Sequence, residues 1–249
     1  MDIKDIIAIA KDAGKAILHI YENEDFSKTI DFKSDDSPLT IADQKSHEVI
    51  DAALRILTPN IPILSEEGKE MGFDERKDWT EFWCVDPLDG TKEFIKKNGQ
   101  FTVNIALIKD KKPVIGVIYT PVTDTTYYSD GETAFKEENG ETVQIKVNKK
   151  AEKRIAVRSA SHASEEEDVL LKQYDVVDTI SKGSSLKFCM VAEGKADIYY
   201  RHGPTMEWDT AAGQAIVQGA GGVVLNPDKT DFNYNKEVLR NGSFLCLGF

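Results

Sequence analysis

The sequence predicts a mixed fold in which an α+β half, residues 1–150, is joined to an α/β half, residues 151–249. Two observations lead to this prediction. Two helical patterns and a series of short β-rich segments fill the first half, whereas strands and helices alternate after Arg154. A chain of 249 residues with 41% hydrophobic content can bury a sizeable core. No low-complexity linker or internal repeat separates the halves, so we expect one compact body with two subdomains.

Two helices open the first half. Apolar residues between Ile3 and Tyr21 fall largely on one helical face, and those between Val49 and Leu57 repeat the pattern until Pro59 ends the second helix. Short β-rich runs follow, and Asn139-Gly140 between two of them is typical of a hairpin turn. We therefore expect a largely antiparallel sheet built from Ile61–Leu64, Phe82–Val85, Phe101–Ile108, Val114–Tyr119, Thr125–Ser129, Ala134–Lys136 and Thr142–Val147.

The second half alternates strands with helices, which is typical of an α/β arrangement. Ser164 and Glu167 have the spacing of a capping box at one helix start, and Gly194 ends another helix. The expected order is strand Ile155–Arg158, a helix from Ser164, strand Val176–Ile180, helix Ser184–Glu193, strand Ala196–Tyr200, helix Thr210–Gln218, and strands Val223–Leu225 and Phe244–Leu247.

Charge and cysteine content exclude several classes of protein. The chain has 31 basic and 43 acidic residues and a net charge of −12, which repels nucleic acid and anionic lipid at long range. Its three cysteines lie far apart in apolar runs, as expected of reduced core residues in a cytoplasmic protein. We find no signal peptide and no apolar run long enough to span a membrane. Whether the protein is a monomer or a homodimer, and whether it attaches to the cytoplasmic face of the inner membrane, is left open.

Three short acidic runs, Ser65–Glu67, Asp86–Thr91 and Trp208–Asp209, point to a metal site. Two of them follow apolar, strand-like segments, and side chains at strand ends converge where loops border a cleft. Carboxylate oxygens are the ligands that Mg²⁺ prefers, and such ions favour hydrolysis of phosphate esters. The acids that could share two or three Mg²⁺ ions are Glu66, Asp86, Asp89 and Asp209.

Asp43 and Asp209 each have two interpretations, and Gly90 and Thr91 could act beside the acids. Asp43 follows Thr40 at the spacing of a capping box, but it could also accept a proton that the Thr91 hydroxyl passes from an attacking water. Gly90 and Thr91 open a short helical stretch whose free backbone N–H groups could cradle a phosphate. Asp209 could be a helix N-cap as well as a metal ligand.

A negatively charged protein needs positive side chains to hold a substrate phosphate that lies away from the metal ions. Lys187, near the start of the helix expected from Ser184, is one candidate, and Arg158 with His162 after a neighbouring strand is another. The alternative for Lys187 is a solvated lysine on a helix face.

With these motifs the chain resembles the lithium-sensitive, magnesium-dependent inositol monophosphatase superfamily. It contains the Glu-Glu, Asp-Pro-Leu-Asp-Gly-Thr and Trp-Asp elements in the order typical of that superfamily, and the likeness extends over essentially the whole chain. The segments Asp86–Phe94, Gly99–Leu107, Gly183–Cys189 and Val191–Gly194 are similar to its bacterial branch of 3′(2′),5′-bisphosphate nucleotidases.

The resemblance implies a layered αβαβα sandwich of the sugar-phosphatase type, with an antiparallel sheet in the N-terminal half and a mixed sheet in the C-terminal half. It implies that Asp43 and Thr91 activate the attacking water. Metal ligation is expected from Glu66, Asp86, the carbonyl of Leu88, Asp89 and Asp209. Substrate contacts are expected from Glu66, Leu88, Asp89, Gly90, Thr91, Arg158, His162, Ser184, Lys187 and Asp209.

The implied substrate is the small nucleotide 3′-phosphoadenosine 5′-phosphate, a by-product of sulfate assimilation, whose 3′-phosphate would be removed to leave AMP. Because the metal motifs are shared across the superfamily, an inositol or sugar monophosphatase is the alternative. A second alternative is a non-catalytic regulator that binds a phosphate or nucleotide.

Overall fold

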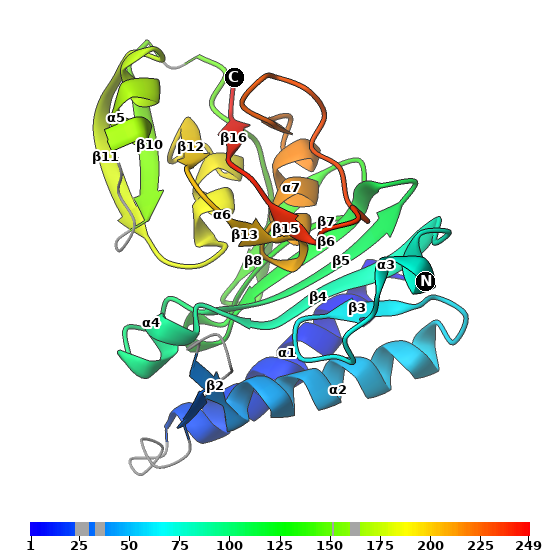
Figure 1. Ribbon diagram of the computed structural model, residues 1–249. Coiled ribbons are helices and arrows are strands. Elements are labelled where there is room, and N and C mark those ends of the chain that lie inside the picture. The colour runs from blue at the N-terminus through cyan, green and yellow to red at the C-terminus, as the bar shows by residue number, and fades with distance from the viewer. Residues whose placement is uncertain (23–29, 33–37, 151, 160–164) are drawn as a thin grey trace.

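The protein is a sandwich of five layers in which helices and sheets alternate (Figure 1). The computed structural model describes residues 1–22, 30–32, 38–150, 152–159 and 165–249. In order, the layers are α1 with α2, a seven-stranded sheet, α6 with α7, a five-stranded sheet, and α5. The helices are α1 (Ile3–Tyr21), α2 (Ile41–Leu57), α3 (Phe73–Arg76), α4 (Thr91–Ile95), α5 (Glu165–Lys172), α6 (Leu186–Ala192) and α7 (Glu207–Gly219). The expected αβαβα order is therefore confirmed.

Helices α1 and α2 lie side by side across the face of the seven-stranded sheet that is lowest in Figure 1. Asp2 begins α1 with a capping box, since its carboxylate accepts a hydrogen bond from the Lys4 N–H at 3.0 Å and its own N–H donates to Asp5 at 3.1 Å. The buried apolar stripes predicted from the sequence, such as Ile6 and Ile17 on α1, pack against the sheet.

The seven-stranded sheet has its strands in sequence order, from β3 to β9. Strands β3 and β4 are parallel, and all the other neighbours are antiparallel, as predicted. The strands are β3 (Ile63–Ser65), β4 (Glu81–Asp89), β5 (Thr102–Lys109), β6 (Lys112–Thr120), β7 (Thr125–Ser129), β8 (Ala134–Glu138) and β9 (Glu141–Ile145), with the short 3₁₀ turn η2 (Pro121–Thr123) between β6 and β7.

Strand β4 shows how the sheet directs one acid toward α7. Along it, Trp83 packs in the core beneath α1 and α2, whereas Phe82 and Cys84 pack in the core on the α7 side. Asp86 follows the same alternation as Phe82 and Cys84 and therefore lies on the α7 side of the strand. The pairing of β4 with β5 becomes irregular after Asp86, where Pro87 cannot donate a ladder hydrogen bond.

The five-stranded sheet has the order β11-β10-β12-β16-β14. Its first three strands are parallel and the remaining pairs antiparallel, so this sheet is mixed, as expected. Its strands are β10 (Arg154–Ser159), β11 (Val176–Lys182), β12 (Ile198–Arg201), β14 (Val223–Leu225) and β16 (Phe244–Leu247). Two small antiparallel pairs complete the fold, β1 (Ile30–Phe32) with β2 (Pro38–Thr40), and β13 (Thr205–Met206) with β15 (Arg240–Asn241).

Two predicted helix starts were wrong. The helix expected from Ser184 begins at Leu186, because Ser184 has a left-handed backbone with φ 45°. The helix expected from Thr210 begins three residues earlier, at Glu207. The capping box predicted at Ser164 lies outside the described residues.

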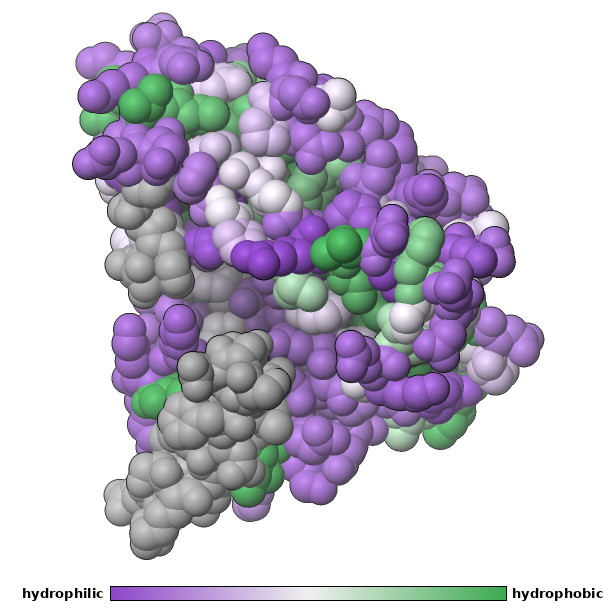
Figure 2. Space-filling model, in the orientation of Figure 1, coloured by the Kyte–Doolittle hydropathy of each residue, from purple (hydrophilic) through white to green (hydrophobic). Residues whose placement is uncertain are grey.

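Close contact between α7 and the seven-stranded sheet fixes the central layer. A Cβ atom placed on Gly116 of β6 would lie 2.5 Å from the carbonyl oxygen of Ala212 on α7, so only glycine permits this approach. The face of the molecule in Figure 2 is mainly hydrophilic, with apolar residues scattered in small groups. None of the described helices is long and apolar enough to span a membrane.

Candidate active site

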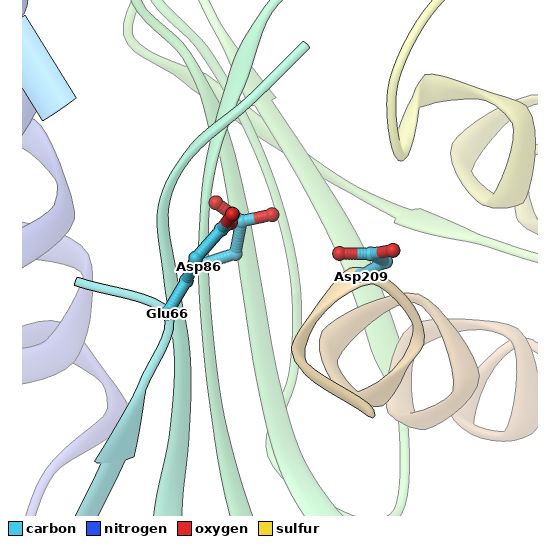
Figure 3. Close-up of side chains that lie close together, drawn as sticks. All are labelled: Glu66, Asp86 and Asp209. Atoms are coloured by element: carbon cyan, nitrogen blue, oxygen red, sulfur yellow. The ribbon is translucent and has the colours of Figure 1, made fainter. Parts of the chain in front are cut away.

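Three carboxylates from three separate elements meet at one edge of the seven-stranded sheet (Figure 3). Because β3 and β4 run parallel, Glu66 after β3 and Asp86 near the end of β4 project side by side. Asp209, in the first turn of α7, faces them. One oxygen of each lies within 4.8 Å of one oxygen of the other two. Three of the four acids predicted to share a site therefore lie together, and Asp89 lines the same pocket as these three.

Repulsion among the buried carboxylates of this group favours the binding of a cation. Asp86 is 1% exposed, and its burial, followed by the charges of Glu66 and Asp89, raises its pKa well above the ordinary value. Burial and the Asp89 charge raise the pKa of Asp209 as well. Since the group consists of hard oxygen donors, it fits Mg²⁺ better than a thiophilic or imidazole-bound metal.

The turn between Asp86 and Thr91 is held by one hydrogen bond within the turn and one from α2. The Leu88 N–H donates to Asp86 Oδ1 at 3.1 Å, and Ser46 Oγ on α2 donates to the Pro87 carbonyl at 2.7 Å. Gly90 has φ 92°, and a side chain there would also press on Ser184. These contacts fix the position of the Leu88 carbonyl oxygen. This oxygen is a predicted metal ligand, and because it belongs to the backbone, no pattern of side chains in the sequence reveals it.

Asp43 and Asp209 each had two interpretations. Asp43 is buried in the first turn of α2, and its charge is the smallest of those that raise the pKa of Asp86. The side chain of Thr40, its expected capping partner, lies outside the described part of the chain. Asp209 is not an N-cap, because it is the third residue of α7 and its Oδ2 accepts from the Met206 N–H at 2.8 Å.

A pocket next to the acids is lined by three basic residues, the exposed Lys92 and, deeper, Lys187 and Arg201. Asp89, Asp209 and Tyr199 line the same pocket. Lys187 is 7% exposed, so the interpretation as a solvated lysine is wrong; its Nζ donates to the Ser184 carbonyl at 2.5 Å. Burial lowers the pKa of Lys187, and the nearby Arg201 charge lowers it further.

Arg201 was missed by the sequence analysis. Within the described residues it forms no ion pair, and its buried Nε hydrogen has no acceptor. Its position at the end of a predicted strand could have indicated it, because strand-end positions also indicated the acids.

A sequence model of the inositol monophosphatase family matches residues 2–246. The chain belongs to the inositol monophosphatase family.

Among relatives in this family, the chain is 50% identical over 249 residues to the 3′(2′),5′-bisphosphate nucleotidase CysQ of Salmonella typhimurium, covering 99% of this chain and 98% of the relative. The crystal structure of CysQ from Bacteroides thetaiotaomicron matches with a TM-score of 0.87 and 41% identity, covering 100% of this chain and 98% of the other. An inositol monophosphatase from Anabaena matches with a TM-score of 0.75 and 25% identity, covering 98% and 89%.

Inositol monophosphatase family members depend on metal ions, generally Mg²⁺, and the acidic group of this chain could hold such an ion. Of the other predicted anion-binding pair, Arg158 does not line the pocket. Arg158 forms ion pairs with Glu167 at 3.1 Å and Asp168 at 2.8 Å on the opposite side of β10, between β11 and α5. Its neighbour Ser159 reaches the pocket instead, since successive strand residues face opposite ways. His162 lies outside the described residues.

Proposed function

We propose that this protein is a 3′(2′),5′-bisphosphate nucleotidase that hydrolyses 3′-phosphoadenosine 5′-phosphate to AMP and phosphate. The observation that carries the proposal is the pair of cations, Lys187 and Arg201, in a pocket that also borders Asp89 and Asp209. A relative that is 50% identical over the whole chain bears the same activity in its name.

The two-part site suits a substrate with two phosphates. The 3′-phosphate would lie at the acidic group with its metal ions, and the 5′-phosphate would pair with Lys187 and Arg201. A buried cation is costly unless an anion compensates it. Inositol 1-phosphate has a single phosphate and would bring no second anion to these two cations, which favours the nucleotide over the inositol alternative.

Two or three Mg²⁺ ions would be held by Glu66, Asp86, Asp89, Asp209 and the Leu88 carbonyl, as predicted. When bound, such ions supply Lewis acidity that activates water near neutral pH and stabilises charge on the phosphoryl and leaving oxygens.

The protein's own residues would orient the attack and move the proton. The Thr91 hydroxyl donates to the Leu88 carbonyl at 3.4 Å, a long bond from which it can turn toward a water. The buried carboxylate of Asp43 would then accept the proton that the water gives up through Thr91. Gly90 allows the scissile phosphate to approach the backbone, and Ser184 borders the pocket for the second phosphate.

Phosphate release in the presence of Mg²⁺ tests the proposal. We expect kcat/KM to be highest for 3′-phosphoadenosine 5′-phosphate in a panel with 3′-phosphoadenylyl sulfate, inositol 1-phosphate and fructose 1,6-bisphosphate. Preference for inositol 1-phosphate would replace the proposal with the inositol monophosphatase alternative. Binding of the nucleotide without turnover of any substrate would favour the non-catalytic regulator.

A further inference from the structure

Ser185 lies at the junction between the acidic group and the phosphate pocket, and its hydroxyl contacts a predicted metal ligand. It is 2% exposed and directly precedes α6. Its Oγ donates a 2.6 Å hydrogen bond to Oδ2 of Asp89, and it also lies 3.2 Å from the carbonyl oxygen of Asp209. A buried hydroxyl therefore stands between two residues that we assign to the metal ions.

A chain of buried hydrogen bonds decides which way this hydroxyl points. Thr102 Oγ1 donates to Asn104 Oδ1 at 3.0 Å, which orients the Asn104 amide. The Asn104 Nδ2 then donates to Ser185 Oγ at 2.8 Å. Since Ser185 Oγ accepts from Asn104, its own hydrogen is donated elsewhere, and Asp89 Oδ2 at 2.6 Å is a nearer acceptor than the Asp209 carbonyl at 3.2 Å. Both Thr102 and Asn104 are at most 1% exposed, so water does not compete for these bonds.

We propose that Ser185 is a positioning residue for metal binding, oriented by the Thr102–Asn104 pair on β5. The proposal rests on the assignment of Asp89 as a metal ligand in the proposed function. The Ser185 bond occupies Oδ2 of Asp89 and holds its rotamer, so that Oδ1 is the oxygen presented to an ion. Hydrogen-bond partners of this kind orient ligands and raise metal affinity.

The residues in this chain of hydrogen bonds come from different parts of the fold. Thr102 and Asn104 belong to the seven-stranded sheet, whereas Ser185 belongs to the loop that follows β11 of the five-stranded sheet. Asp89 comes from the first part and Asp209 from the helix between the sheets. Ser185 thus contacts one ligand from the first sheet and one from α7, although it belongs to neither element.

Mg²⁺ titration calorimetry on the metal-free full-length protein tests this role without measuring turnover. We expect Ser185→Ala to weaken Mg²⁺ binding by about 10- to 100-fold. Thr102→Val keeps the side-chain shape but removes the first donor. It should also weaken Mg²⁺ binding, but by less than Ser185→Ala does. The matched control is Ser129→Ala, a fully buried serine on β7 whose Oγ accepts from the Gly131 N–H at 3.2 Å far from the site. Its Mg²⁺ affinity should equal that of the wild type.

The outcomes separate this proposal from the proposed function. If wild type binds no Mg²⁺, the metal site itself is wrong. If wild type binds and folded Ser185→Ala binds equally well, within about twofold, the positioning role is overturned and the metal site stands. If Ser129→Ala weakens binding as much as Ser185→Ala, the effect is a general loosening of the fold, which also overturns it. In the activity assay, Ser185→Ala should raise the Mg²⁺ concentration for half-maximal rate while KM for the nucleotide at saturating Mg²⁺ stays near the wild-type value.

Discussion

Asp86 is a buried acid whose pKa is raised by the charges of several neighbouring acids. We expect Asp86→Asn to lower kcat by about a thousandfold or more, because the shared anionic ligand is lost. The metal-free variant should melt at the same temperature as the wild type or higher, since one of several buried like charges is gone. Steady-state kinetics and melting in EDTA check both parts. Asp12→Asn, an exposed acid on α1, is the control and should change neither. Near-normal turnover of folded Asp86→Asn would contradict the assignment.

Thr91 and Asp43 are proposed to act on one water molecule. If so, Thr91→Ala and Asp43→Asn should each reduce kcat, and the double variant should lose less than the product of the two reductions. A double-mutant cycle in kcat at saturating Mg²⁺ measures this coupling. Reductions that simply multiply would instead favour a structural role for Asp43 at the start of α2.

Lys187 is expected to distinguish a bisphosphate from a monophosphate. Lys187→Ala removes a charge-assisted contact worth about 1.5–3 kcal/mol, which corresponds to roughly a 10- to 100-fold loss in kcat/KM for 3′-phosphoadenosine 5′-phosphate. With 3′-AMP, which lacks the 5′-phosphate, the loss should be small. Lys187→Met, which fills the same buried space without charge, is the matched control for packing and should behave like Lys187→Ala. Equal losses with the two substrates would show that Lys187 does not contact the 5′-phosphate.

At the scale of elements, the position of Asp209 depends on how closely α7 packs on the first sheet. Gly116→Ala should lower the free energy of unfolding by about 1–3 kcal/mol, because its Cβ would meet the α7 backbone, which cannot rotate away. Gly242→Ala is the control, since nothing lies within 4 Å of a Cβ added there. Chemical denaturation of both variants gives the comparison, and a Gly116→Ala protein as stable as Gly242→Ala would show that the two layers can separate freely.

The elements themselves were predictable where a local pattern determines them. The amphipathic stripe of α1 and the β-rich runs of the first sheet are short-range signals, and the strands formed close to the expected positions. Helix starts were less predictable. Ser184 and Ser185 are ordinary helix-start residues in the sequence, but the left-handed backbone of Ser184 places its neighbour against Asp89, a contact made across 96 residues. Local sequence contains no information about that partner.

At the scale of the whole molecule, binding of Mg²⁺ should stabilise the fold. A concentration 100 times the dissociation constant adds about 2.7 kcal/mol to the free energy of unfolding, and EDTA should reverse it together with activity. The folded-state pKa values of Asp86 and Asp209 lie above their unfolded values. The metal-free protein is therefore expected to lose stability as pH rises from about 4 through the raised pKa values, so the gain from Mg²⁺ should be largest near neutral pH. Melting temperatures across pH with Mg²⁺ or EDTA measure this; an equal gain at pH 5 and pH 8 would contradict it.

The fold class and the family could be predicted from the sequence, and so could a candidate set of acids for the site. The reason is that an acid placed directly after an apolar strand lies at a strand end in any packing of that strand, so Glu66 and Asp86 were recognisable from their neighbours alone. Parallel pairing of β3 with β4 then placed them together.

Which positive charges lie near those acids depends on contacts between distant parts of the chain. Arg158 and Arg201 both lie near strand ends, but only Arg158 was predicted to bind an anion. Folding brings Glu167 and Asp168 of α5 against Arg158, which neutralises it, whereas Arg201 turns into the pocket beside Lys187. The hydrogen bonds from Thr102 through Asn104 and Ser185 to Asp89 have the same origin, because their members are distant in the chain and meet only when the two sheets close on α6 and α7.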